Sequence, residues 1–180
     1  MKEVVDVSQT PLVALGTLAY QGAAVADVTA LSYWTYQADP THALTLQFDI
    51  HDAGAKYHRL VFEPGPGSGN AAILSNTWQR WSPLGGAWWV THPNGVECTQ
   101  AKPCAWDRIL ANYPGASVSG ATLFKAGGGW LPWSGNVDAF TIGTSAKHAT
   151  TYNFEPAKPS DDGNGGDGGG DNSDNLSSDS

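Results

Sequence analysis

Two runs of β-forming residues lie within residues 43–64, and apolar and polar side chains alternate strictly along the first of them; this stretch constrains the fold more than any other feature of the chain. From Leu44 to Ile50 every second side chain is apolar, which is the period of a β-strand with one buried face. A five-residue break at 52–56 separates this run from a second one that begins at Tyr57. The pattern predicts an antiparallel hairpin whose apolar face lies in a core.

The parity of the two runs also predicts the register of this hairpin. With the break as the loop, Asp49 lies opposite Arg59 on the polar face, and Phe48 lies opposite Leu60 on the apolar face. A carboxylate and a guanidinium are therefore expected to meet across the two strands. The other predicted pairs are His51 with Tyr57, Gln47 with Val61, Ile50 with His58, and Leu46 with Phe62.

Further short runs of β-forming residues indicate that most of the chain is β-structure. The 180 residues include 22 Gly, 11 Pro and eight Trp, while only 14% of them are charged. This composition is typical of an all-β domain with many turns. Strands are expected within residues 4–20, 25–37, 116–126, 137–142 and 150–154. Residues 77–84 and 87–91 are expected to form a second hairpin around a Gly-Gly turn.

One helix is expected among these strands. Trp106, Ile109, Leu110 and Tyr113 lie at positions i, i+3, i+4 and i+7, which is one stripe of an α-helix. A Pro-Gly pair at 114–115 ends it. We therefore predict an all-β fold, an antiparallel two-sheet β-sandwich of the jelly-roll type with one short helix in a connection.

The charge is concentrated at the C-terminal end. The formal charge is −8, and six aspartates lie between residues 160 and 180, where there is no Lys or Arg. Residues 1–159 therefore carry only −2, without the basic clusters that nucleic acid requires. Residues 1–156 are predicted to form the β-sandwich domain, and residues 157–180 a flexible acidic tail or linker rich in Gly, Asp, Asn and Ser.

Cys98 and Cys104 are the only cysteines, and they flank a five-residue segment. A loop disulfide between them is favoured over two free thiols, and it implies an oxidising compartment. A secreted or cell-surface location is therefore expected. The N-terminal residues lack the apolar stretch of a signal peptide, so the chain is expected to be a mature form or an excised domain. No membrane-spanning segment is predicted.

The tryptophans are the strongest candidates for ligand contacts, because flat aromatic rings stack on the C–H faces of sugars. Trp78 and Trp81 differ in parity, as do Trp88 and Trp89, so each strand is expected to bury one indole and to offer the other. The alternative is that the rings simply fill the core. The predicted ligand contacts are Trp81, Trp88, Trp130, Trp133, Gln79 and Arg80.

Asp138 is the one candidate metal ligand. It shares parity with Phe140 and Ile142, so it is expected to point towards the core, where a carboxylate needs a partner. The sequence leaves two alternatives for this partner: a structural Ca²⁺, or the backbone amides of a nearby loop.

Five motifs together resemble a module that recurs in secreted, multidomain bacterial proteins. They are RLVFEP at 59–64, GAWW at 86–89, ILANYPGA at 109–116, GNVDAFTIG at 135–143 and TTYNFEP at 150–156. This resemblance covers Leu15 to Pro156 and implies a location and an architecture, not an activity. More loosely, the strand at 137–143 is similar to the last strand of jelly-roll carbohydrate-binding modules. In some of those, an aspartate at the position of Asp138 holds a structural calcium, and Glu3 or Asp6 would be its acidic partner here.

The leading functional hypothesis is a non-catalytic extracellular module that binds a glycan or cell-surface polymer, with no cofactor required. The chain contains none of the local motifs of nucleophilic, phosphate-binding, dinucleotide-binding or metalloprotease sites. A second hypothesis is a structural or adhesive domain of a surface protein or assembly, acting through protein–protein contacts. An enzymatic function would need two carboxylates about 5–9 Å apart in a cleft.

Overall fold

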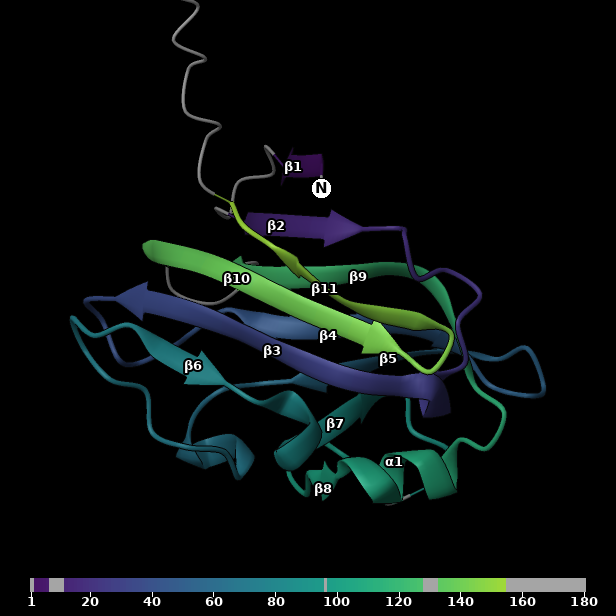
Figure 1. Ribbon diagram of the computed structural model, residues 1–180. Helices are drawn as coiled ribbons and strands as arrows, with labels where there is room; N and C mark the ends of the chain where they lie inside the picture. The colour runs from purple at the N-terminus through teal and green to yellow at the C-terminus, as the bar shows by residue number, and fades with distance from the viewer. Residues whose placement is uncertain (1, 7–11, 96, 128–132, 155–180) are drawn as a thin grey trace, which may run out of the picture.

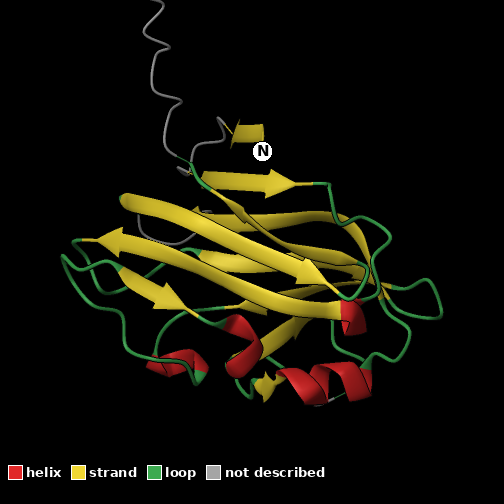
Figure 2. Ribbon diagram, in the orientation of Figure 1, coloured by secondary structure: helices red, strands yellow, loops and turns green. Residues whose placement is uncertain are grey.

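The computed structural model describes residues 2–6, 12–95, 97–127 and 133–154, which form a β-sandwich. Two antiparallel sheets lie face to face, one of seven strands and one of four (Figure 1; Figure 2). This confirms the predicted all-β, two-sheet architecture with one short α-helix. The predicted tail at 157–180 lies outside the described residues.

The chain crosses between the two sheets several times along its length. The larger sheet has the spatial order β1–β2–β9–β4–β5–β7–β8, and the smaller sheet has the order β11–β10–β3–β6. The strands of the larger sheet are β1 (Lys2–Asp6), β2 (Leu12–Thr17), β4 (Thr45–His51), β5 (Tyr57–Phe62), β7 (Ala87–Thr91), β8 (Cys104–Ala105) and β9 (Ser117–Gly127). Those of the smaller sheet are β3 (Val28–Gln37), β6 (Gln79–Trp81), β10 (Gly135–Thr144) and β11 (Lys147–Tyr152). The helices of the described residues are α1 (Trp106–Asn112) and three one-turn 3₁₀ helices at Val25–Asp27, Pro66–Ser68 and Pro83–Gly85.

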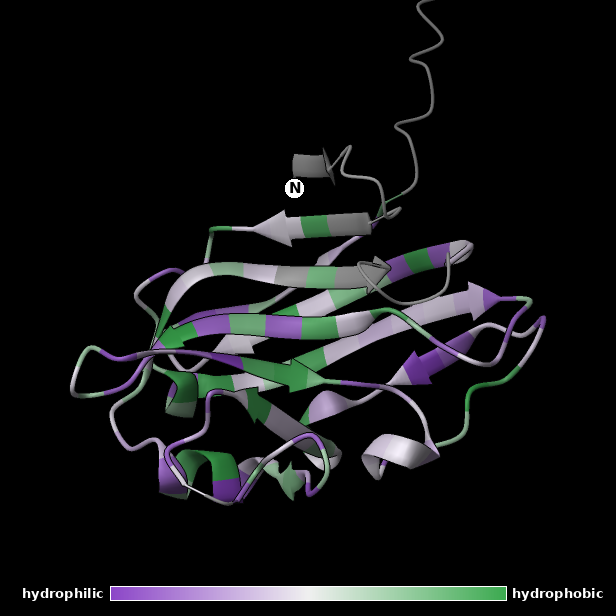
Figure 3. Ribbon diagram, turned by 180° about the vertical axis from the view of Figure 1, so that it is seen from behind, coloured by the Kyte–Doolittle hydropathy of each residue, from purple (hydrophilic) through white to green (hydrophobic). Residues whose placement is uncertain are grey.

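β4 and β5 form the predicted central hairpin, and all six predicted residue pairs are observed. Phe48 and Phe62 lie buried between the sheets. On the other face, Arg59 Nε donates to Asp49 Oδ1 at 2.6 Å. Hydrophilic and hydrophobic residues alternate along β4 in Figure 3. The two-residue period therefore assigns the side chains of this hairpin correctly.

β6 and β7 do not form the predicted second hairpin. β6 pairs with β3 in the smaller sheet, β7 pairs with β5 in the larger one, and the turn Pro83–Gly85 carries the chain between the sheets. Trp81 and Trp88 enter the same core from opposite sheets, and both pack near Phe62, with ring centroids 6.5 and 5.6 Å from it. The prediction is wrong because alternation shows which face of a strand is buried but not to which sheet the strand belongs.

The helix and the disulfide are both confirmed. α1 buries Trp106 and Ile109, two members of the predicted stripe. Cys98 and Cys104 are bonded, with 5.0 Å between their Cα atoms, and they close the loop that leads to α1. The Val90 N–H donates to the Cys98 carbonyl at 2.8 Å, which attaches this loop to β7. Among the described residues, no helix has the length and apolar character to cross a membrane.

Candidate functional site

Two of the predicted ligand contacts lie in the core. Trp88 is 0% exposed, and its Nε1 donates to the Pro83 carbonyl at 2.8 Å. Trp81 is 3% exposed, and its Nε1 donates to Thr35 Oγ1 at 2.8 Å. The assignment of Trp88 as a ligand contact is therefore wrong, because a ring without exposed surface cannot stack on a sugar. Trp81 reaches the surface only as part of the pocket described below.

Trp133 and Gln79 are half-buried, and hydrogen bonds within the protein hold both of them. Trp133 Nε1 donates to Gln37 Oε1 at 3.2 Å. The side-chain amide of Gln79 bonds through both its nitrogen and its oxygen to backbone groups of the loop before β6. The bonds orient these side chains, so their polar atoms are already engaged within the protein. Trp130 lies outside the described residues.

Asp138 points to the outer face of the smaller sheet and not towards the core. A β-bulge shifts the register of β10 against β3 between Asp138 and Thr141, and Ala139 within it has a φ of +48°. Asp138 therefore pairs with Trp34, whose ring faces outward. The predicted orientation is wrong, because the extra residue of a bulge reverses the two-residue period.

Backbone N–H groups donate hydrogen bonds to the Asp138 carboxylate. Its Oδ1 accepts the N–H of Ala139 at 2.6 Å and that of Phe154 at 3.2 Å, which is one of the two alternatives that the sequence leaves open. The described residues contain no group of three or more His, Cys, Asp or Glu side chains arranged to hold a metal ion. The side chains of Glu3 and Asp6 lie outside the described part of the chain, so calcium binding stays a prediction.

The structure reveals an aromatic surface on the outer face of the smaller sheet, formed by Trp34, Tyr36 and Trp78. Trp34 is 36% exposed, Trp78 is 46% exposed, and Tyr36 is half-buried. The rings of Tyr36 and Trp78 lie 5.7 Å apart with an interplanar angle of 48°. We call these three residues the outer aromatic surface. It combines two residues of β3 with Trp78, which lies directly before β6 and 42 positions after Tyr36 in the sequence.

Polar side chains border the outer aromatic surface. Arg80 of β6 and Asp138 of β10 lie directly opposite Trp34 on its two sides, and Asn136 lies opposite Tyr36. Arg80 and Asn136 are exposed, and Arg80 Nη1 donates to Ser82 Oγ at 3.3 Å. Exposed rings therefore alternate with groups that form hydrogen bonds, which is the arrangement that an amphipathic ligand such as a sugar requires.

Part of this surface was visible in the sequence. The opposite parity of Trp78 and Trp81 predicts one buried and one exposed indole, and Trp78 is the exposed one. Trp34 and Tyr36 were missed because the strand at 31–37 carries aromatic residues at both parities. Only the packing of Tyr33 into the core shows which side of β3 faces water.

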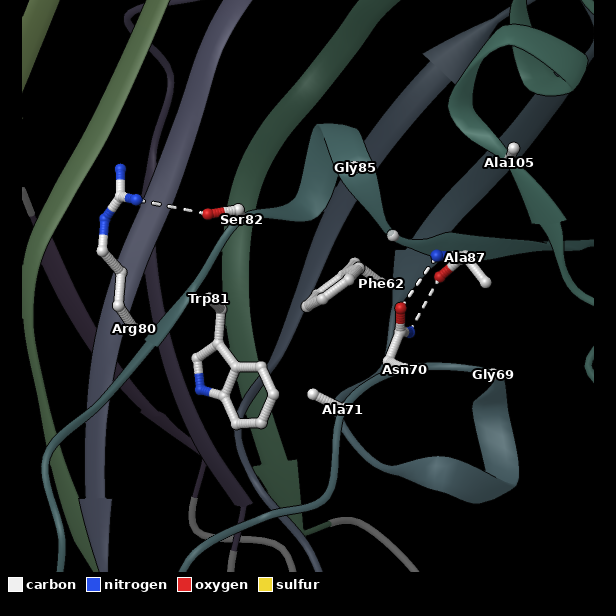
Figure 4. A pocket seen from close by; sticks show the side chains of 11 residues that line it. Phe62, Gly69, Asn70, Ala71, Arg80, Trp81, Ser82, Gly85, Ala87 and Ala105 are labelled. Atoms are coloured by element: carbon white, nitrogen blue, oxygen red, sulfur yellow. Dashed lines mark hydrogen bonds between the residues drawn. The ribbon is translucent and has the colours of Figure 1, made fainter.

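A pocket of about 550 Å³ opens at the edge of the sandwich, between β6 and the start of β7 (Figure 4). Arg80 and Ser82 line it on the side of the outer aromatic surface, and the largely buried rings of Phe62 and Trp81 lie at its bottom. Small residues form the rest of the lining: Gly69, Ala71, Gly85, Gly86, Ala87 and Ala105, together with Asn70.

Asn70 and Gly86 hold the shape of this pocket. Asn70 Oδ1 accepts the Ala87 N–H at 2.8 Å, and its Nδ2 donates to the Ala87 carbonyl at 3.0 Å, so the loop before β6 is bonded to β7 (Figure 4). A Cβ atom at Gly86 would lie 2.5 Å from Phe62 Cε2 and 2.6 Å from Asn70 Oδ1. Only glycine therefore fits at this position without displacing the side chains of Phe62 and Asn70, which line the pocket.

A separate polar network surrounds Asp52 in the loop of the central hairpin. Its Oδ1 accepts the N–H groups of Gly54 and Lys56, both at 2.9 Å. Its Oδ2 lies 3.2 Å from Asn94 Nδ2 and 3.2 Å from Nε2 of the fully buried His58. The network connects the hairpin loop to the loop after β7, so its role is structural.

This network predicts a specific dependence of stability on pH. The backbone N–H of Lys56 and the side-chain amide of Asn94 lower the pKa of Asp52 to about 2. Because an unfolded aspartate has a pKa of about 3.9, the charged carboxylate stabilises the fold above about pH 4 and loses this effect as the pH falls towards 2. We expect the Tm difference between the wild type and Asp52→Asn to be largest at pH 5 and to shrink steadily by pH 2 in circular dichroism melts. A constant difference over that range would contradict this assignment.

Comparisons of the chain with protein-family models, with curated proteins and with solved structures found no match. The resemblances described from the sequence motifs therefore stay predictions. The function is inferred from the outer aromatic surface and the adjoining pocket.

Proposed function

We propose that this protein is a non-catalytic extracellular module that binds carbohydrate on the outer aromatic surface. The observation that carries the proposal is the exposure of two indoles, Trp34 and Trp78, on the outer face of the smaller sheet. Neighbouring exposed aromatic rings often mark a ligand or partner site, because covering their apolar surface is favourable. A pyranose ring fits this requirement, because its C–H face is apolar and its hydroxyl groups remain at the edge.

The border of the surface supplies complementary polar groups. The exposed guanidinium of Arg80 offers donors, and the exposed amide of Asn136 offers both donors and an acceptor. Hydroxyl groups require both kinds of partner, since each one donates and accepts. The aromatic rings thus match the apolar face of a sugar, and the polar border matches the hydroxyl groups at its edge.

The disulfide supports the extracellular part of the proposal. Bonds of this kind persist in oxidising environments and are rare in the cytosol. The bond between Cys98 and Cys104 is local and closes a surface loop beside α1, so it adds stability in a compartment where no reductant opposes it.

Removing either exposed indole is expected to weaken glycan binding. Trp34→Ala and Trp78→Ala should each raise the Kd by about 5- to 30-fold, which corresponds to about 1–2 kcal/mol for the loss of one stacked ring. A glycan array and pull-down on insoluble polysaccharides would first identify the ligand with the wild-type chain. Depletion isotherms on that ligand would then compare the variants.

Tyr57→Ala provides the matched control, because Tyr57 is an exposed aromatic residue of the larger sheet. It should leave the Kd unchanged. If folded wild-type protein bound no glycan in either assay, the proposed function would be overturned. Equal weakening by all three variants would exclude the outer aromatic surface as the binding site.

A structural or adhesive domain is the second candidate function. Exposed Trp and Tyr side chains are also enriched in protein interfaces, so the same surface could bind a protein partner or a second copy of the chain. A stable oligomer in light scattering, dissociated by Trp34→Ala and by Trp78→Ala but not by Tyr57→Ala, would favour this function over carbohydrate binding.

A further inference from the structure

We propose that the pocket beside the outer aromatic surface binds a uronic acid residue of an acidic glycan, with Arg80 as the partner of its carboxylate. This inference rests on the proposed carbohydrate-binding function and names the class of glycan.

The charge of the pocket is the first argument. Arg80 lines the pocket, and among the lining residues that the structure describes none is acidic. Its guanidinium donates to the neutral hydroxyl of Ser82, and the three ion pairs in the part of the chain that the structure describes all involve other cations. A guanidinium binds a carboxylate through two parallel hydrogen bonds. The rim of the pocket therefore offers an uncompensated guanidinium for one carboxylate.

The chemistry of the walls is the second argument. Most small-molecule pockets are lined mainly by hydrophobic and aromatic side chains. Here the aromatic rings of Phe62 and Trp81 are almost completely buried, and six of the lining residues are glycine or alanine. A ligand would meet mainly backbone groups, methyl groups, a hydroxyl and a guanidinium. Such a surface suits a hydroxylated ring, and about 550 Å³ lies within the size range of ligand sites.

The pocket is also preformed. The two hydrogen bonds between Asn70 and the backbone of Ala87 hold the loop against β7, and Gly86 packs so closely that a Cβ atom there would lie 2.5 Å from Phe62 Cε2. A preformed site avoids the entropy cost of ordering a loop when the ligand binds.

The position of Arg80 connects the pocket to the outer aromatic surface. Arg80 lies directly opposite Trp34 on the neighbouring strand, and it also belongs to the lining of the pocket. In Figure 4 its guanidinium lies at the rim, next to Ser82 and on the other side of β6 from the Trp81 ring. A glycan chain bound on Trp34 would therefore pass the mouth of the pocket. One residue of the chain could place its carboxylate against Arg80 while a neighbouring ring stacks on the indole.

Calorimetric titration of the full chain with trigalacturonic acid and with its methyl ester tests the inference. The ester keeps the sugar rings and removes the negative charges. We expect the acid to bind at least about 10-fold more tightly than the ester, since a charge-assisted hydrogen-bond pair is lost. The difference in Kd between the acid and the ester should become smaller at high salt, because salt screens an exposed ion pair. Sodium acetate at the same carboxylate concentration should not displace the trimer.

Three variants locate the effect. Arg80→Gln should remove the preference for the acid, and Ala71→Leu should block the pocket and weaken binding of the trimer about 10-fold or more. Ala72→Leu is the matched control, because residue 72 is also exposed and is not among the lining residues of the pocket; it should bind like the wild type. Equal Tm values would establish that all three variants fold.

The outcomes separate this inference from the proposed function. Binding of neutral polysaccharides without a preference for the acid, or a preference that Arg80→Gln leaves intact, would overturn the inference alone. Displacement by acetate would reduce the site to a general carboxylate contact and would also overturn it. Absence of binding to every acidic and neutral glycan would overturn the proposed function as well.

Discussion

Trp88→Ala is expected to lower the free energy of unfolding by about 3–5 kcal/mol, the usual cost of truncating a large buried aromatic residue. Trp88 has no exposed surface. Its ring lies 5.9 Å from Phe48, 5.6 Å from Phe62 and 5.0 Å from Trp106, measured between centroids. Its Nε1 also satisfies the Pro83 carbonyl. The variant therefore leaves a large cavity and a buried acceptor without its donor.

Urea unfolding followed by circular dichroism measures this effect. Trp78→Ala is the matched control, because it removes the same side chain from an exposed position and should change the free energy of unfolding by less than about 1 kcal/mol. If Trp88→Ala does not yield folded protein, Trp88→Phe keeps most of the buried volume and should give an intermediate loss. Equal losses for Trp78→Ala and Trp88→Ala would contradict the assignment of Trp88 to the core.

Removing the disulfide is expected to lower the free energy of unfolding by about 2 kcal/mol. The chain-entropy model relates the stabilisation to the length of the closed loop, and a sequence separation of 6 gives a value at the low end of the usual range. Cys98 is buried beside α1, and its carbonyl accepts the N–H of Val90. The bond therefore keeps the helix and its preceding loop against β7.

The double variant Cys98→Ala with Cys104→Ala tests this value in denaturant titrations. Dithiothreitol provides the internal control: it should destabilise the wild type to the level of the double variant, and it should leave the double variant unchanged. A wild type that is insensitive to complete reduction, verified by thiol counting, would refute a stabilising role for the bond.

These two predictions concern positions that the proposed ligand does not touch. The core indoles determine stability, while Trp34 and Trp78 are expected to affect binding with little effect on folding. The same residue type thus has two separate roles, and the burial of each ring distinguishes them. Measuring stability and binding on one set of tryptophan variants would test this division directly.

Features that depend on neighbouring residues were predictable from the sequence. The six pairs of the central hairpin follow from the parity of two runs joined by a short loop, and all six are observed. The stripe on α1 and the bond between Cys98 and Cys104 are similarly local. In each case the interacting groups are separated by few residues, so the chain has few alternative ways to bring them together.

Features that depend on distant partners required the tertiary structure. The sequence shows that 79–81 and 87–91 are strands with one buried face, but only hydrogen bonds to β3 and β5 assign them to different sheets. The bulge at Ala139 turns Asp138 outward. The choice between the two aromatic faces of β3 depends on which one packs against the opposite sheet. Alternation along a strand is a property of adjacent residues, whereas sheet partners, bulges and the exposed face are determined by contacts between segments far apart in the chain.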